Sequence, residues 1–278
     1  MDNISASQNT LDAARHHYAG VGLTERLKGA LSVFGPADQK LSVSQLGPVD
    51  QFHTRGLEAT AELAHLVELQ PGMHVLDVGA GIGGPARFIA ENFGCTVTGV
   101  DLSAAYVDAA AYLTERTGQS GQVSFITANA LELPFGDGEF DAVFLQHVAM
   151  NIADRSGLYR EMRRVLGPKR RFATYDVVLK DGDPTYPMPW SAGAEGSFLM
   201  TADDTCRAIE EAGFRPILCR DDSEAAKSWI SKLQSSGPPP QPNLGIVIGP
   251  NIVEIMTNLG RAIMQGRLGI LTAVFEAS

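Results

Sequence analysis

Residues 74–84, which read HVLDVGAGIGG, decide the fold of this chain. The apolar residues Val75, Leu76 and Val78 suit a β-strand that is buried on both faces of a parallel sheet. The glycines that follow allow the backbone to turn tightly and to approach a ligand, because they carry no Cβ. A helix-compatible segment, residues 85–92, comes next, and its free N–H groups would point into the same crevice. This order of elements predicts a site for an adenosine-containing cofactor.

The glycine pattern by itself leaves two kinds of cofactor open. Gly79, Gly81 and Gly84 also satisfy the G-x-G-x-x-G pattern of dinucleotide sites. Asp77, however, lies two residues before the first glycine, and its carboxylate would repel a pyrophosphate and attract a cationic group. S-adenosylmethionine carries a sulfonium and an ammonium group and has no phosphate. Asp77 therefore favours S-adenosylmethionine over a nicotinamide dinucleotide.

The composition argues against several classes of protein. The chain has 278 residues, of which 44% are hydrophobic, enough to build a substantial core in one or two domains. Its 22 basic and 32 acidic residues give a net charge of -10, which disfavours nucleic acid and anionic membranes as partners. The first ten residues lack the pattern of a signal peptide, and no apolar run is long enough to span a membrane. We therefore expect a cytoplasmic protein without membrane insertion.

The three cysteines, Cys95, Cys206 and Cys219, are far apart in the sequence. Their odd number and their spacing fit neither a disulfide framework nor a zinc site. We therefore expect no bound metal and a reducing compartment.

Strand and helix patterns alternate from residue 73 onward, which predicts a doubly wound sheet. The expected strands are near 73–79, 95–101, 122–127, 140–146, 171–179, 214–220 and 267–276. The expected helices are near 84–93, 103–117, 155–166, 201–212, 223–234 and 251–265. We predict an α/β fold with a Rossmann-like, seven-stranded sheet whose last strand is antiparallel.

Helical segments are expected before and within this core. Residues 1–72 predict an N-terminal helical cap, and residues 73–278 the core, with a helical insertion at about 222–266 before the final strand. The helices expected in the cap are 11–18, 23–34 and 52–69. Such a cap can cover a cofactor crevice, although simple packing against the sheet is equally allowed.

Two polar residues at strand ends extend the expected cofactor site. Asp101 ends the second strand, where a carboxylate can accept hydrogen bonds from both ribose hydroxyls of an adenosine. The alternative role of Asp101 is to cap the next helix, but Ser103 can do that itself. Asn129 follows the third strand, and its side-chain carbonyl can accept a hydrogen bond from the adenine amino group.

Four further segments resemble one known family; they are residues 50–56, 81–87, 146–152 and 186–190. With the glycine-rich turn, they resemble the class I S-adenosylmethionine-dependent methyltransferases, and among these the small-molecule group of the sarcosine/dimethylglycine N-methyltransferases. The similarity runs from about residue 15 to the end of the chain. It implies S-adenosylmethionine as methyl donor, S-adenosylhomocysteine as product, and a nitrogen, oxygen or carbon atom of a small molecule as acceptor.

The chain departs from this family at two places. Asn129 stands where an aspartate is usual, so the expected contact with adenine rests on an amide. Residues 167–169 read GPK where the family usually has PGG, which should perturb a turn and leave the chemistry unchanged.

The resemblance also implies roles for individual residues. His147 would act as general base with Asp176, whose carboxylate would fix the imidazole tautomer and support its charged form. The alternative, that His147 only positions the acceptor, stays open, because a neutral amine needs no base. The expected cofactor contacts are Tyr18, Phe52, Asp77, Gly79, Ala80, Gly81, Asp101, Leu102, Asn129, Ala130, Leu131 and Gln146. The expected acceptor contacts are Met150, Tyr186 and Trp190, and His53 would help Tyr18 and Phe52 to cover the sulfonium.

Two other functions remain as alternatives. One is a protein that binds S-adenosylmethionine without transferring its methyl group, and the other is a nicotinamide-dependent oxidoreductase. We expect a small-molecule acceptor as partner and leave a homodimer open as the assembly.

Overall fold

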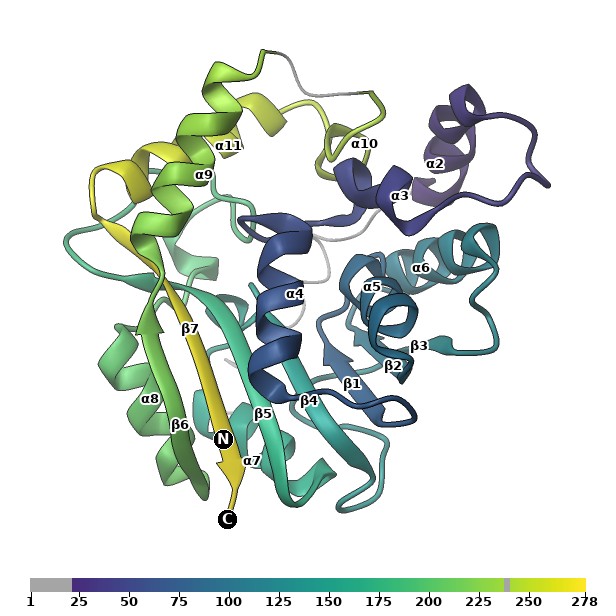
Figure 1. Ribbon diagram of the computed structural model, residues 1–278. Coiled ribbons are helices and arrows are strands. Elements are labelled where there is room, and N and C mark those ends of the chain that lie inside the picture. Colours follow the sequence, from purple (N-terminus) through teal and green to yellow (C-terminus); the bar gives the residue numbers. More distant parts are fainter. Residues whose placement is uncertain (1–21, 238–240) are drawn as a thin grey trace, which may run out of the picture.

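The computed structural model describes residues 22–237 and 241–278, so Tyr18 and the helix expected at 11–18 lie outside the described residues. The strands are β1 (His74–Val78), β2 (Thr96–Asp101), β3 (Val123–Thr127), β4 (Phe140–Gln146), β5 (Leu166–Leu179), β6 (Phe214–Asp221) and β7 (Leu268–Ala277). They form one sheet in the order β3-β2-β1-β4-β5-β7-β6 (Figure 1). β7 runs antiparallel to both of its neighbours. The predicted seven-stranded sheet with an antiparallel last strand is confirmed.

The order of the strands reverses at β1, which lies between β2 and β4. Asp77 of β1 is in register with Gly99 of β2 and with Phe144 of β4. In an open parallel sheet a crevice forms beyond the carboxyl ends of the strands at such a switch point. The glycine-rich turn and the ends of β2 and β4 therefore meet in one place.

The longer helices are α2 (Leu23–Leu31), α3 (Val43–Asp50), α4 (Gly56–Val67), α5 (Gly84–Phe93), α6 (Ala104–Thr117), α7 (Arg155–Val165), α8 (Ala202–Glu211), α9 (Ser223–Ser235) and α11 (Ile252–Met264). The short helices are α10 (Gly245–Ile248), η1 (Ser32–Phe34), η2 (Ala149–Asn151) and η3 (Ala194–Gly196). α2, α3 and α4 precede the sheet in the chain, and α9, α10 and α11 lie between β6 and β7.

Four of these helices were not predicted: α3, α10 and the single turns η2 and η3. α3 contains Pro48, which weakens the helical signal, although Ser42 and Gln45 form a capping box at its start. α10 has only four residues, too few to show a helical period.

The helix expected over residues 52–69 begins only at Gly56. Arg55 adopts a φ of 64°, a left-handed conformation that cannot continue an α-helix. Residues 51–55 therefore form a loop between α3 and α4.

β5 begins at Leu166, five residues before the expected start, because α7 passes directly into it. The pairing of β5 with β4 is irregular between Phe140 and Ala142, which pair with Leu166 and Arg171. The GPK segment at 167–169 lies in this irregularity, and Lys169 has a φ of 59°. The departure from PGG thus coincides with a local change of register.

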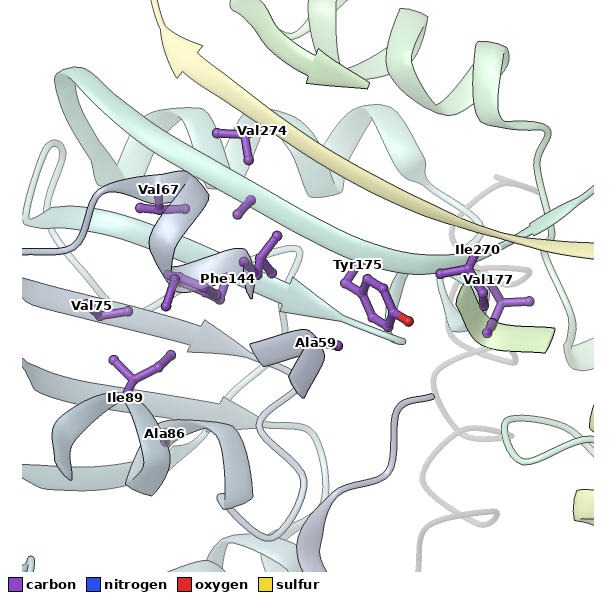
Figure 2. Packing of buried hydrophobic residues seen from close by; sticks show 14 of the residues in the cluster. Ala59, Val67, Val75, Ala86, Ile89, Phe144, Tyr175, Val177, Ile270 and Val274 are labelled. Carbon is purple, nitrogen blue, oxygen red and sulfur yellow. The ribbon is translucent and has the colours of Figure 1, made fainter. Parts of the chain in front are cut away.

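Apolar side chains cover both faces of the sheet, because successive residues of a strand point to opposite faces. Val75, Phe144 and Tyr175 pack on the face that α4 and α5 cover (Figure 2). Leu76 and Phe172 pack on the other face, against residues of α7 and α8. The sheet is therefore buried between two helical layers.

A buried ion pair ties the N-terminal helices to the sheet. The Arg87 guanidinium of α5 lies 2.8 Å from the Asp50 carboxylate of α3, and both side chains are fully buried. Arg87 also donates hydrogen bonds to the carbonyl of Ile82 in the glycine-rich turn, and to the Ala110 carbonyl and the Thr114 hydroxyl of α6. One side chain thus joins α3, α5, α6 and the glycine-rich turn.

Residues 22–237 and 241–278 include all three cysteines, and each is free. Cys206 of α8 and Cys219 of β6 lie with their Sγ atoms 2.6 Å apart. Within these ranges no cluster of three His, Cys, Asp or Glu side chains is placed to hold a metal ion. None of the helices described is both long enough and apolar enough to cross a bilayer.

We predict that Asp50→Ala lowers the free energy of unfolding by about 3–5 kcal/mol, because it leaves the Arg87 charge buried without a partner. The control is Lys227→Ala, which removes an ion pair with the exposed Glu224 on α9 and should change stability little. Urea denaturation measures both variants. Equal midpoints would show that the buried pair does not hold the fold together.

Candidate cofactor and acceptor site

A cavity lies at the carboxyl ends of β1, β2 and β4. The predicted site residues that line it are Phe52, Gly79, Ala80, Gly81, Asp101, Leu102, Asn129, Ala130, Leu131, Gln146, His147, Met150 and Trp190. Asp77 and Asp176 are buried beside it without lining it, and Tyr186 packs against the apolar core instead. Residues that follow different strands come together here because parallel strands end at the same edge.

The glycine-rich turn is held in a conformation that needs glycine. Gly79 has a φ of 71°, and a Cβ added there would lie 2.3 Å from the Val148 side chain. The N–H groups of Gly79 and Ala80 both donate to the carbonyl of Val100 at the end of β2. The backbone of the turn is therefore pressed against β2 and β4, with its inner side open to the cavity.

Asp101 holds this turn with its carboxylate. Its Oδ2 accepts a hydrogen bond of 2.9 Å from the Gly81 N–H, and its Oδ1 accepts one of 2.9 Å from the Ser103 N–H. The side chain of Ser103 caps α6 by accepting from the Tyr106 N–H, as expected. Burial raises the pKa of Asp101 to about 6.

Two buried polar atoms near the cavity have no hydrogen-bond partner among the described residues: Asp77 Oδ2 and Gln146 Nε2. Both side chains project from the same face of adjacent strands, since Asp77 pairs with Phe144, two residues before Gln146. A buried carboxylate oxygen needs a donor and a buried amide N–H needs an acceptor. An amino acid group, with its ammonium and its carboxylate, supplies both.

Burial, and then the charge of Asp101, raises the pKa of Asp77 to about 7. The carboxyl is therefore near its titration point at neutral pH. A cation that reached this carboxylate would favour its ionised form.

Asn129 Oδ1 accepts a hydrogen bond of 3.0 Å from the Leu131 N–H. The amide oxygen has a second lone pair, so a hydrogen bond to a ligand amine remains available. Asn129 therefore occupies the wall of the cavity with its side chain oriented by its own loop.

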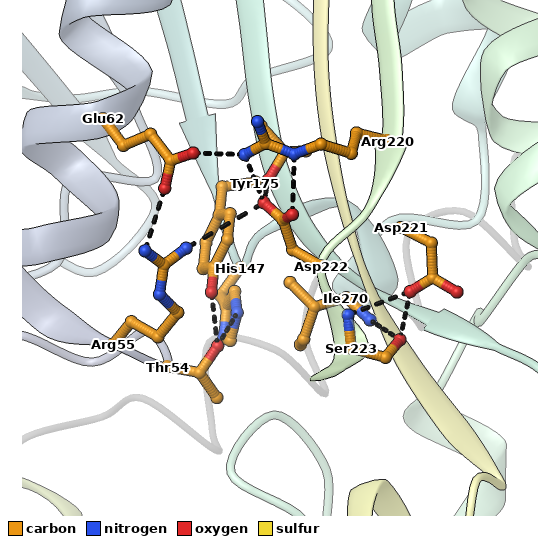
Figure 3. Close-up of polar contacts among 11 residues, drawn as sticks. Thr54, Arg55, Glu62, His147, Tyr175, Arg220, Asp221, Asp222, Ser223 and Ile270 are labelled. Atoms are coloured by element: carbon orange, nitrogen blue, oxygen red, sulfur yellow. Dashed lines mark hydrogen bonds and ion pairs between the residues drawn. The ribbon is translucent and has the colours of Figure 1, made fainter. Parts of the chain in front are cut away.

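The structure does not bring His147 and Asp176 into the hydrogen bond that the resemblance implies. Asp176 accepts instead from the N–H groups of Ala149 and Val177, each at 2.9 Å. His147 stacks on Tyr175, with ring centroids 5.5 Å apart (Figure 3). Because Tyr175 and Asp176 are successive residues of β5, their side chains point to opposite faces of the sheet, and His147 lies on the Tyr175 side.

The loop at 51–55 contributes more to the site than sequence reasoning found. The buried His53 ring lines the cavity and meets the His147 ring edge-on, with centroids 6.1 Å apart. The Thr54 hydroxyl lies 3.0 Å from the Tyr175 hydroxyl and 3.5 Å from His147 Nε2 (Figure 3). The resemblance of residues 50–56 had indicated Phe52 and His53, but nothing in the sequence indicated Thr54, and most of this segment was expected to be helical.

The rest of the cavity is lined mainly by apolar side chains, together with Asp50, Asn151 and Asp154. Met150 and Trp190 were predicted, whereas Val247 and Ile248 of α10 and Ile255 of α11 were not. The Trp190 indole N–H donates to the Ser197 hydroxyl at 2.9 Å, which fixes the ring. Among the described residues that line the cavity, none is Lys or Arg. This end of the cavity suits an apolar molecule without a negative charge.

Comparison with known proteins gives the family. Residues 76–174 match the model described as "Methyltransferase domain". Sterol 24-C-methyltransferase ERG6B of Gibberella zeae is 31% identical over 223 residues, which are 76% of this chain and 57% of that protein. The chain belongs to the class I S-adenosylmethionine-dependent methyltransferases. Methyltransferase phqN of Penicillium fellutanum is 35% identical over 175 residues, which are 60% of this chain and 53% of that protein. The chain thus spans a little over half the length of these two relatives.

Solved structures share the fold of this chain. The [4+2]-cyclase SpnF has a TM-score of 0.69 at 20% identity, with 96% of each chain covered. A putative sarcosine dimethylglycine methyltransferase from Galdieria sulphuraria has a TM-score of 0.60 at 17% identity, with 91% of this chain and 98% of that chain covered. At these identities the likeness shows the common sheet and its order of elements.

We predict that Gly79→Ala lowers the affinity of this methyltransferase for S-adenosylhomocysteine at least about tenfold, because the new Cβ would displace Val148 and the turn. Gly72→Ala is the matched control, since Gly72 also has a positive φ but nothing lies within 4 Å of an added Cβ. Isothermal titration calorimetry gives the affinities, and melting curves confirm that both variants fold. Equal affinities of Gly79→Ala and the parent protein would show that the turn is not part of the cofactor site.

Proposed function

We propose that this chain transfers a methyl group from S-adenosylmethionine to a nitrogen, oxygen or carbon atom of a small, largely apolar molecule. The observation that carries this proposal is one cavity with two different ends. Unpartnered buried polar atoms lie at one end, beside the glycine-rich turn, and apolar side chains line the other. The domain match, the sterol 24-C-methyltransferase ERG6B and the methyltransferase phqN support the same reaction class.

The residues present fit the cofactor. Asp77 would hold the ammonium and Gln146 the carboxylate, because Asp77 Oδ2 and Gln146 Nε2 are buried near the cavity without a hydrogen-bond partner among the described residues. Asp101 would accept from the ribose hydroxyls, and Asn129 from the adenine amino group. Bound S-adenosylmethionine supplies an electrophilic methyl group on its sulfonium, so the protein has to orient the acceptor and exclude water.

The helices of the cap and of the insertion, which pack on the same face of the sheet, would enclose the acceptor. In this proposal residues 1–72 act as a cap over the cavity, and the insertion at about 222–266 supplies its apolar wall through Val247, Ile248 and Ile255. Apolar contacts align the acceptor without a charge of their own. An acceptor with a phosphate group would find no Lys or Arg among the described lining residues.

The reaction is tested with methyl-labelled S-adenosylmethionine and a panel of apolar alcohols, phenols and secondary amines. Mass spectrometry detects S-adenosylhomocysteine and the labelled product. We expect both to form with at least one acceptor and not without it. A protein that retains the labelled cofactor but forms no S-adenosylhomocysteine would be a binding protein, and one that binds a nicotinamide dinucleotide instead would refute the cofactor assignment.

We predict that the affinity for S-adenosylhomocysteine rises roughly tenfold between pH 6 and pH 8. The pKa of Asp77 is about 7 in the empty cavity, so at the lower pH its proton must leave before the carboxylate can hold the ammonium. In Asp77→Asn this proton is absent, and the affinity should vary much less with pH. Calorimetry at several pH values measures both proteins, and a parent affinity that is constant over this range would contradict the role of Asp77.

A further inference from the structure

One ring nitrogen of His53 is committed to a hydrogen bond that fixes its proton. Nε2 lies 2.8 Å from the carbonyl oxygen of Gly56. A carbonyl oxygen only accepts, so Nε2 carries the hydrogen, and in a neutral imidazole Nδ1 then carries a lone pair. Nδ1 has no hydrogen-bond partner among the described residues, and the side chain lines the cavity.

Thr60 supports the same tautomer. Its hydroxyl donates to Gln146 Oε1 at 3.1 Å, so its single hydrogen is used. The contact of 3.0 Å between this hydroxyl and His53 Nε2 is therefore a hydrogen bond donated by the histidine. A carbonyl and a hydroxyl thus hold the same N–H group, and Nδ1, the other ring nitrogen of this cavity-lining side chain, carries the lone pair.

We propose that His53 Nδ1 takes the proton that a hydroxyl acceptor loses when it is methylated. This step rests on the proposed function. A bond forms between the acceptor atom and the methyl carbon while the bond from carbon to the sulfonium breaks, and sulfur keeps that electron pair. The acceptor's bond to hydrogen then breaks, and its proton moves to Nδ1. The Gly56 carbonyl continues to accept from Nε2 in the imidazolium that results.

The buried position of His53 is compatible with this role. Burial lowers its pKa to about 4, against the opposing effect of the Gly56 hydrogen bond, so the ring is neutral and ready at pH 7. A methylated oxonium is a far stronger acid than the neutral hydroxyl acceptor, which favours transfer even to a weak base. The sulfonium loses its charge in the same reaction, so the cavity contains one positive charge before and after the transfer.

His147 is less suited to this step. Its Nε2 lies 3.5 Å from the Thr54 hydroxyl, which also bonds to Tyr175, so no group of fixed polarity sets its tautomer. Burial, and then the nearby His53, lowers the pKa of His147 well below its usual value. Because the two rings are close, only one of them can hold the positive charge. In this proposal the His147 ring is part of the cavity lining and positions the acceptor beside His53.

Nitrogen NMR of the histidine side chains in the S-adenosylhomocysteine complex tests the tautomer. We expect His53 to show a protonated Nε2 and an unprotonated Nδ1 at pH 7, with its signal assigned by its loss in His53→Gln. A proton on Nδ1 at this pH would overturn the proposal.

The second arm measures turnover with a hydroxyl acceptor from the panel. His53→Gln can still donate to Gly56, but it lacks the basic nitrogen. We expect its kcat to fall about 100-fold or more, with S-adenosylhomocysteine affinity within about twofold of the parent. With a phenol, its rate should recover as pH rises and the phenol ionises, whereas the parent rate stays nearly constant. His147→Gln is the comparison and should show no such recovery.

His53→Asn adds a variant that separates a base from a positioning group. Its amide oxygen can accept a hydrogen bond near the place of Nδ1 but cannot take the proton. Parent-like turnover in either His53 variant would overturn the proposal. If the parent protein forms no S-adenosylhomocysteine with any acceptor, the proposed function is refuted. The proton transfer to His53 is then refuted as well, whatever tautomer is observed.

Discussion

The ion pair between Arg87 and Asp50 is the constraint on which the site depends. Both charges are fully buried, so each must be balanced inside the protein. Arg87 meets this need by reaching α3, the Ile82 carbonyl of the glycine-rich turn and two acceptors on α6, and only its Nε lacks a partner. The N-terminal helices therefore cannot shift relative to the turn without leaving a charge unpaired.

This constraint also sets the position of the loop that contains His53 and Thr54. At one end Asp50 is held by Arg87, and at the other Arg55 pairs with Glu62, while Arg220 bridges Glu62 and Asp222 (Figure 3). Ion pairs on both sides of the loop therefore hold it over the ends of β4 and β5. The geometry proposed for proton transfer to His53 depends on this position of the loop, because it places Nε2 beside Gly56 and Thr60 of α4.

Site residues at the ends of strands could be predicted from the sequence, whereas contacts between different helices and strands could not. Asp77, Gly79, Asp101 and Asn129 lie at or just beyond the carboxyl ends of strands, and the parallel sheet itself brings such residues to one edge. Whether His147 can pair with Asp176 depends on whether the two side chains lie on the same face of the sheet. The sequence around residue 176 does not specify this. The apolar wall from α10 was also missed, because four residues show no period.

The sequence by itself determined the sheet, its antiparallel last strand, the glycine-rich turn and the family, because these features depend on local periodicity, turn chemistry and residues adjacent in the chain. Only the tertiary structure decided that Asp77 and Gln146 lack partners, that the loop at 51–55 lies over the cavity, and that His53 has its lone pair on Nδ1. The physical reason is that burial and hydrogen bonding are set by groups far apart in the chain, such as Thr60 and Gln146, which meet only when the helical layer packs on the sheet.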